Sequence, residues 1–84
     1  MADERIRMLV EQAVARRFEE WAAVHPSLAA VIDRITLTDQ AVQSLRATEG
    51  YRQAVAAYHQ ARSEQELLGQ FLELAGTVLG TMLR

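Results

Sequence analysis

Residues 63–84 read SEQELLGQFLELAGTVLGTMLR, and this stretch decides the fold. Plotted at about 100° per residue, its apolar side chains cover roughly half of the helix circumference, and its polar side chains form one narrow stripe. A helix on the surface of a monomer needs an apolar stripe of only about 100°. We therefore expect a C-terminal helix that contacts two neighbours at once, with the rest of the chain packed around it.

The length of the chain suggests how this wide apolar face is covered. A chain of 84 residues forms one small domain, which buries only about 60% of the surface that the unfolded chain exposes. Such domains usually gain stability from disulfides, a metal or a partner subunit, and the sequence has no cysteine. We expect an all-α protein, a single domain over residues 1–84, built as a small bundle of four to five helices and completed by homodimerisation.

The spacing of apolar residues predicts five helices, listed here by residue number: 3–24, 27–35, 39–49, 51–62 and 64–83. Pro26 ends the first helix. The run Ile35 to Asp39 contains β-branched residues and is expected to end the second, with Thr36 or Thr38 as the next N-cap. Gly50 is expected to separate the next two helices, as a breaker or a left-handed C-cap.

The boundary between the last two predicted helices has two readings. Ser63 and Glu66 have the spacing of a capping box, which favours a new helix. However, no glycine or proline lies between Tyr51 and Leu68, so one continuous helix of about 33 residues is the alternative. Such a rod would favour an exchanged or extended dimer.

The predicted homodimer interface follows the C-terminal helix and part of the first. Arg17 lies in the apolar stripe of the first helix, where its stem can lie along an aromatic ring or its guanidinium can pair with a partner's carboxylate. Gly76 and Gly80 either permit close approach of another helix or soften the helix end. The expected interface residues are Leu68, Phe71, Leu72, Ala75, Gly76, Leu79, Gly80, Met82, Leu83, Arg17 and Trp21.

Composition argues against several functional classes. The net charge is -2 and the predicted pI about 5.6, so no general field attracts nucleic acid or an anionic membrane. The N-terminal residues MADERIRMLVEQ do not resemble a secretory signal. The most apolar stretch is interrupted by Gln70 and Glu73 and is too short to span a bilayer. We expect a cytoplasmic protein that binds neither membrane nor nucleic acid.

Few residues could perform chemistry. His25 and His59 are the only histidines, and neither belongs to a spacing that holds a metal. No glycine-rich phosphate loop is present. We therefore expect no cofactor and no enzymatic activity. The favoured function is a protein-interaction or regulatory module that binds itself through the C-terminal helix and also binds another protein, as a small phage-type or accessory factor would.

Two alternatives stay open. Residues Leu37–His59 have the outline of a helix-turn-helix DNA-binding motif, in which Tyr51, Arg52, Gln53 and His59 would face the DNA. In addition, Arg52 and His59 are seven residues apart on one helix face. This eight-residue segment resembles the R-x(4-6)-H motif of HEPN-type ribonucleases, which implies phosphate binding by Arg52 and proton transfer by His59 in a dimer.

Overall fold

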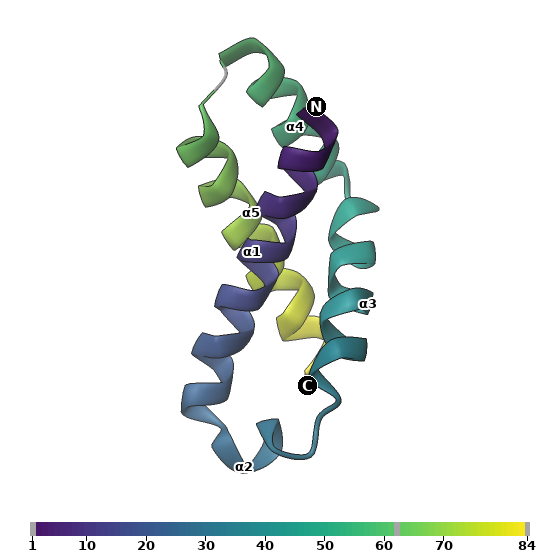
Figure 1. The fold of residues 1–84 in the computed structure, drawn as a ribbon, viewed down its shortest axis with the longest axis vertical. Coiled ribbons are helices and arrows are strands. Elements are labelled where there is room, and N and C mark those ends of the chain that lie inside the picture. The colour runs from purple at the N-terminus through teal and green to yellow at the C-terminus, as the bar shows by residue number, and fades with distance from the viewer. Residues whose placement is uncertain (1, 62, 84) are drawn as a thin grey trace.

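The computed structural model describes residues 2–61 and 63–83, and within these residues the chain forms five helices and no strand (Figure 1). This confirms the all-α prediction and the expected number of helices. The molecule is elongated, with extents of 42 × 21 × 19 Å. The helices are α1 (Ala2–Val24), α2 (Pro26–Ala29), α3 (Arg34–Arg46), α4 (Glu49–Ala61) and α5 (Glu64–Met82).

Helix α5 is the centre of the fold, as its sequence predicts. It packs most extensively against α1 and also contacts α3 and α4. Its buried residues recur every fourth position and form one line along the helix: Leu67, Phe71, Ala75 and Leu79. Three neighbours in the same chain therefore share the wide apolar face. This coverage removes the argument that the middle of α5 needs a second chain.

Helices α3 and α4 together form the third side of the bundle, opposite α1 and α5 (Figure 1). They are separated at Thr48, whose hydroxyl donates to the Leu45 carbonyl at 2.7 Å and accepts from the Tyr51 amide at 3.1 Å. The expectation for Gly50 was wrong, because this residue lies in the first turn of α4. A Cβ there would stand 2.6 Å from Leu74 Cδ2, so glycine permits close approach of α4 and α5.

The predicted helices at 27–35 and 39–49 were also wrong in their bounds. Helix α2 ends at Ala29, and α3 already begins at Arg34, inside the run expected to break a helix. The N-cap is Asp33, whose carboxylate accepts from the Thr36 amide at 3.3 Å and the Thr36 hydroxyl at 2.8 Å. Aspartate caps more strongly than threonine, and β-branched residues lower helix propensity only slightly.

Helices α4 and α5 are two helices, so the continuous alternative does not form. Ser63 has extended backbone, with φ -99° and ψ 108°, and its hydroxyl accepts from the Glu66 amide at 3.3 Å. The Ser63 cap is therefore confirmed. Next to it, Arg5 of α1 pairs with Glu64 of α5, with Nη2 to Oε2 at 3.1 Å. This ion pair joins the starts of two helices that are far apart in sequence.

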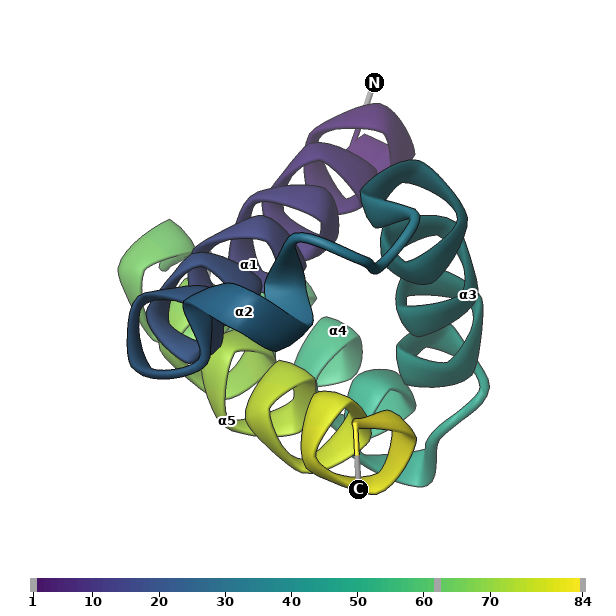
Figure 2. The ribbon, with the colours of Figure 1, turned by 90° about the horizontal axis from the view of Figure 1, so that it is seen from below.

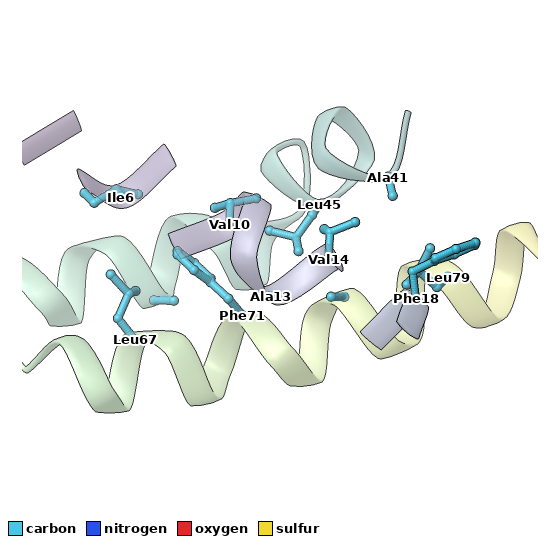
Figure 3. Close-up of a cluster of buried hydrophobic side chains, with 12 residues drawn as sticks. Ile6, Val10, Ala13, Val14, Phe18, Ala41, Leu45, Leu67, Phe71 and Leu79 are labelled. Atoms are coloured by element: carbon cyan, nitrogen blue, oxygen red, sulfur yellow. The ribbon is translucent and has the colours of Figure 1, made fainter. Parts of the chain in front are cut away.

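The hydrophobic core is one cluster of side chains from α1, α3, α4 and α5 that extends along the bundle (Figure 3). It extends from Ile6 and Leu67 at one end to Phe18 and Leu79 at the other. The Tyr51 ring stacks on Phe71, with 5.6 Å between centroids. Helix α2 contributes no buried residue. The core residues are Ile6, Val10, Ala13, Val14, Phe18, Ala41, Leu45, Ala54, Leu67, Phe71, Ala75 and Leu79.

Candidate interaction surface

Exposed apolar side chains are concentrated in one segment of the chain. Five large apolar residues are exposed among those described, and four of them lie between Val24 and Ile35. Val31 is 82% exposed and Leu28 is 55% exposed. The fifth, Met8, lies in the first half of α1. Single exposed apolar residues are ordinary, whereas a cluster of them marks a candidate contact surface.

A groove of about 390 Å³, to which Leu28, Val31 and Ile32 of this segment contribute, lies at the end of the bundle where α2 lies. Figure 2 looks at this end and shows α2 between the end of α1 and the start of α3. We call this hollow the α2-end groove. Its lining is mostly apolar and comes from four helices and the α2–α3 turn: Trp21, Leu28, Val31, Ile32, Leu37, Met82 and Leu83.

The sequence around Pro26 explains why the groove stays open. Pro26 occupies the first position of α2, where its fixed φ suits a helix and its missing N–H is not needed. Helix α2 has only four residues and is followed by a turn. One helical turn is too short to cover the end of the bundle. Leu28 and Val31 consequently remain at the surface, while Ile32 is half-buried.

Two ion pairs form within the chain near this end of the molecule, where the Asp33 carboxylate is also exposed. Glu19 pairs with Arg34, whose guanidinium carbon also lies 5.4 Å from the Phe18 ring centroid. Arg17 donates to Glu20 at 2.9 Å. The Thr36 hydroxyl and amide lower the pKa of the Asp33 carboxyl below its usual value. None of the residues that line the α2-end groove is charged, so the groove suits an apolar ligand better than a charged one.

A second groove, of about 520 Å³, lies between α4 and α5 and has a different character. Its walls combine small residues with Gln53, Gln70, Glu73 and Thr77. Leu74 is its one large apolar residue, and that side chain is half-buried. This lining resembles an ordinary solvated helix surface, so its larger volume is a weaker sign of binding than the exposed leucine and valine of the α2-end groove.

The predicted interface residues fall into separate environments. Trp21, Met82 and Leu83 line the α2-end groove. Phe71, Ala75 and Leu79 are buried in the core, and Leu68 and Leu72 are half-buried against it. The buried residues are inaccessible to a second chain while this fold is kept. Contact of any of them with another chain stays a prediction.

Arg17, Gly76 and Gly80 complete the predicted set. A Cβ on Gly76 would stand 2.6 Å from Arg17 Nη2, so the guanidinium of α1 lies directly over this glycine of α5. The Arg17 side chain thus lies against α5, and its guanidinium pairs with Glu20 of its own helix. Gly80 is exposed, and a Cβ there would meet no atom within 4 Å. No helix of the described chain accounts for the glycine at this position.

The prediction omitted most of the groove. Leu28, Val31, Ile32 and Ile35 have the spacing of one short apolar helix face, and this is the signal that could have found the groove. Apolar periodicity indicates a face to be covered, and the sequence does not reveal that α2 stops too early to cover it. Leu37 was hidden in the expected helix break. It is a half-buried residue of α3.

The residues of the two alternative functions lie on α4. Arg52 is exposed and pairs with Glu49 at 3.3 Å, and His59 is exposed beside the Tyr58 ring. Gln53 is also exposed, whereas Tyr51 is half-buried and its ring stacks on Phe71. Among residues 2–61 and 63–83, no cluster of three metal-ligating side chains occurs. Both alternatives stay untested predictions.

Comparisons of the chain with known protein families, curated proteins and solved structures find no match. In the described part of the chain, no helix combines the length and the apolar character that crossing a bilayer requires.

Proposed function

We propose that this protein is a non-enzymatic helical interaction module that binds another protein chain through the α2-end groove. The observation that carries this proposal is the concentration of exposed apolar side chains between Val24 and Ile35, beside an apolar hollow. Apolar patches with this arrangement are typical of protein contact surfaces. A partner would bury side chains that the isolated chain leaves in water.

The fold itself does not need these side chains. Helix α2 has no buried residue, and Val31 is 82% exposed, so a polar residue at position 31 would cost the isolated chain little. Trp21, which lines the groove, offers the kind of rigid aromatic surface that dominates many protein interfaces. Apolar side chains that contribute little to folding and lie beside an aromatic anchor favour a role in binding.

Site-specific photo-crosslinking in cells that produce the protein tests this proposal. Val31 is replaced by p-benzoylphenylalanine in one variant, and Met8, which is also exposed but lies in the first half of α1, is replaced in the other. The two sites are separated from each other by most of the length of α1. We expect protein adducts from position 31 and not from position 8. Equal adducts from both positions, or none from position 31, would refute the proposal.

A further inference from the structure

We propose that residues 26–32 form a lid that moves between the open position of this structure and a closed position over the α2-end groove. In the closed position, Leu28 and Val31, which now line the groove, enter the hollow and contact Trp21. The lid controls the access of a partner to the groove, and this role rests on the proposed function. The movement itself is a property of the isolated chain.

The backbone hydrogen bonds place one hinge of the lid at His25. The His25 amide donates to the Trp21 carbonyl of α1 at 2.9 Å, whereas the His25 carbonyl accepts from the Ala29 amide at 3.0 Å. The bonds of α1 and those of the lid thus divide at one Cα atom. Pro26 follows directly and has no N–H group with which to extend α1. Rotation about the φ angle of His25 therefore breaks neither hydrogen bond.

A second hinge lies between Ile32 and Asp33. The Ile32 amide donates to the Ala29 carbonyl, within the lid, at 3.3 Å. Asp33 instead belongs to α3, because its carbonyl accepts from Leu37 at 3.0 Å and its carboxylate accepts from Thr36. Between the two hinges, α2 has no buried residue. Few buried contacts allow a segment to move while the rest of a fold stays in place.

The apolar side chains of the lid favour the closed position. Leu28 and Val31 are three residues apart in a turn, in which the Val31 amide donates to the Leu28 carbonyl at 3.2 Å. Both side chains are exposed, and both line the groove, so one rotation can carry both inward. The groove of about 390 Å³ has room for them, since a cavity of about 150 Å³ already holds a benzene molecule. The lid need not cover the whole end of the bundle.

Two opposing contributions favour exchange between the open and closed positions. Closing removes the apolar surface of two side chains from water, whereas it restricts the backbone of residues 26–32 to one arrangement. An apolar side chain of a partner competes with Leu28 and Val31 for the same hollow. The affinity measured for a partner is therefore reduced by the fraction of chains that are closed.

Acrylamide quenching of Trp21 fluorescence tests the lid in the purified full chain. Trp21 is the only tryptophan and lines the groove, and acrylamide is uncharged, so quenching reports how far the groove is open. Val31→Glu should hold the lid open, because the closed position would bury an unpaired carboxylate. The quenching constant should rise, by about twofold where open and closed chains are equally populated. Met8→Glu adds the same charge at an exposed residue in the first half of α1 and should leave quenching unchanged.

The direction of the change separates a moving lid from a fixed rim. Glutamate is larger than valine, so on a fixed segment it would shield Trp21, and quenching would stay equal or fall. Either result would overturn the proposal. Circular dichroism verifies that both variants keep their helix content.

Methyl relaxation dispersion of the wild type gives a second readout that needs no variant. Exchange on the microsecond to millisecond timescale should appear at the methyl groups of Leu28 and Val31, and not at Met8. Absence of exchange at Leu28 and Val31 would also overturn the lid.

The lid and the proposed function can fail separately. Photo-crosslinking from position 31 reports a bound protein, whereas quenching reports the isolated chain. Adducts from position 31 together with unchanged Trp21 quenching would remove the lid and keep the binding surface. Raised quenching in Val31→Glu without adducts from position 31 would keep the lid and remove the partner.

Discussion

Gly69→Ala should stabilise the protein, because this glycine lies inside α5 without a contact that requires it. A Cβ at position 69 would meet no atom within 4 Å, and the position is exposed. Alanine in a helix interior is more favourable than glycine by about 1 kcal/mol, mainly because the unfolded chain loses conformational freedom. For a chain of this size, that gain should raise the melting temperature by about 4–8 °C.

Gly80→Ala and Gly50→Ala are the matched comparisons. Gly80 is equally open but lies near the end of α5, where fraying should make the gain smaller. Gly50 differs in that a Cβ would lie 2.6 Å from Leu74 Cδ2 and force that side chain to move. Overpacking of this kind costs about 1–3 kcal/mol. The Gly50→Ala protein should therefore be less stable than the Gly69→Ala protein by at least about 1 kcal/mol.

Urea unfolding followed by circular dichroism measures these differences, with the slope m as a control for changes in the unfolded state. Gly69 and Gly80 are about 16 Å apart along the helix, so their effects should add. The reasoning fails if Gly69→Ala lowers the urea midpoint, or if Gly50→Ala matches Gly69→Ala. Loss of self-association in Gly80→Ala, at undiminished stability, would instead support the sequence-based prediction that Gly80 lies in an interface.

The remaining predictions concern the core, a cap and pH. Phe71 is fully buried in α5, and Phe71→Ala should lower the free energy of unfolding by about 3–5 kcal/mol. Thermal unfolding should then show a chain that is largely unfolded before heating begins. Ser63→Ala should cost about 1 kcal/mol, because it leaves the Glu66 amide without its capping acceptor; the urea midpoint reports this, and Ser63→Asp should restore it. The side-chain hydrogen bond from Arg5 lowers the pKa of Glu64, and the hydroxyl of Thr36 lowers that of Asp33. A carboxyl group with a lowered pKa stabilises the fold at pH values above its unfolded pKa, which is 4.5 for Glu64 and 3.8 for Asp33. That contribution is lost as the pH falls through the folded pKa. The urea midpoint should thus fall in this acidic range, and the double variant Glu64→Gln, Asp33→Asn should show a weaker fall.

The sequence predicted the long helices well and the short connections poorly. Helices α1 and α5 were found because their apolar residues repeat over many turns, and Ser63 was found because its hydroxyl and Glu66 have capping spacing. The boundary near Asp33 was missed because the apolar series Leu28 to Ile35 continues across it. Apolar spacing does not show where a helix ends when a strong N-cap such as Asp33 lies within the apolar series.

The candidate site was predicted only in part, for a tertiary reason. Trp21 and Met82 were predicted as interface residues, and they line the α2-end groove. Phe71 and Leu79 were predicted for the same interface but are core residues. Periodicity shows which face of α5 is apolar. It does not show that three helices of the same chain cover most of that face while α2 leaves Val31 open.

The elongated core has a consequence for how long the folded chain persists. Proteins open locally where buried apolar contacts are fewest, so we expect opening of this bundle to begin at its ends. The tip beside Phe18 and Leu79 is the one that carries the α2-end groove. A chain bound there would stabilise that end of the bundle, and the lifetime of the fold would then rise with the concentration of the bound chain.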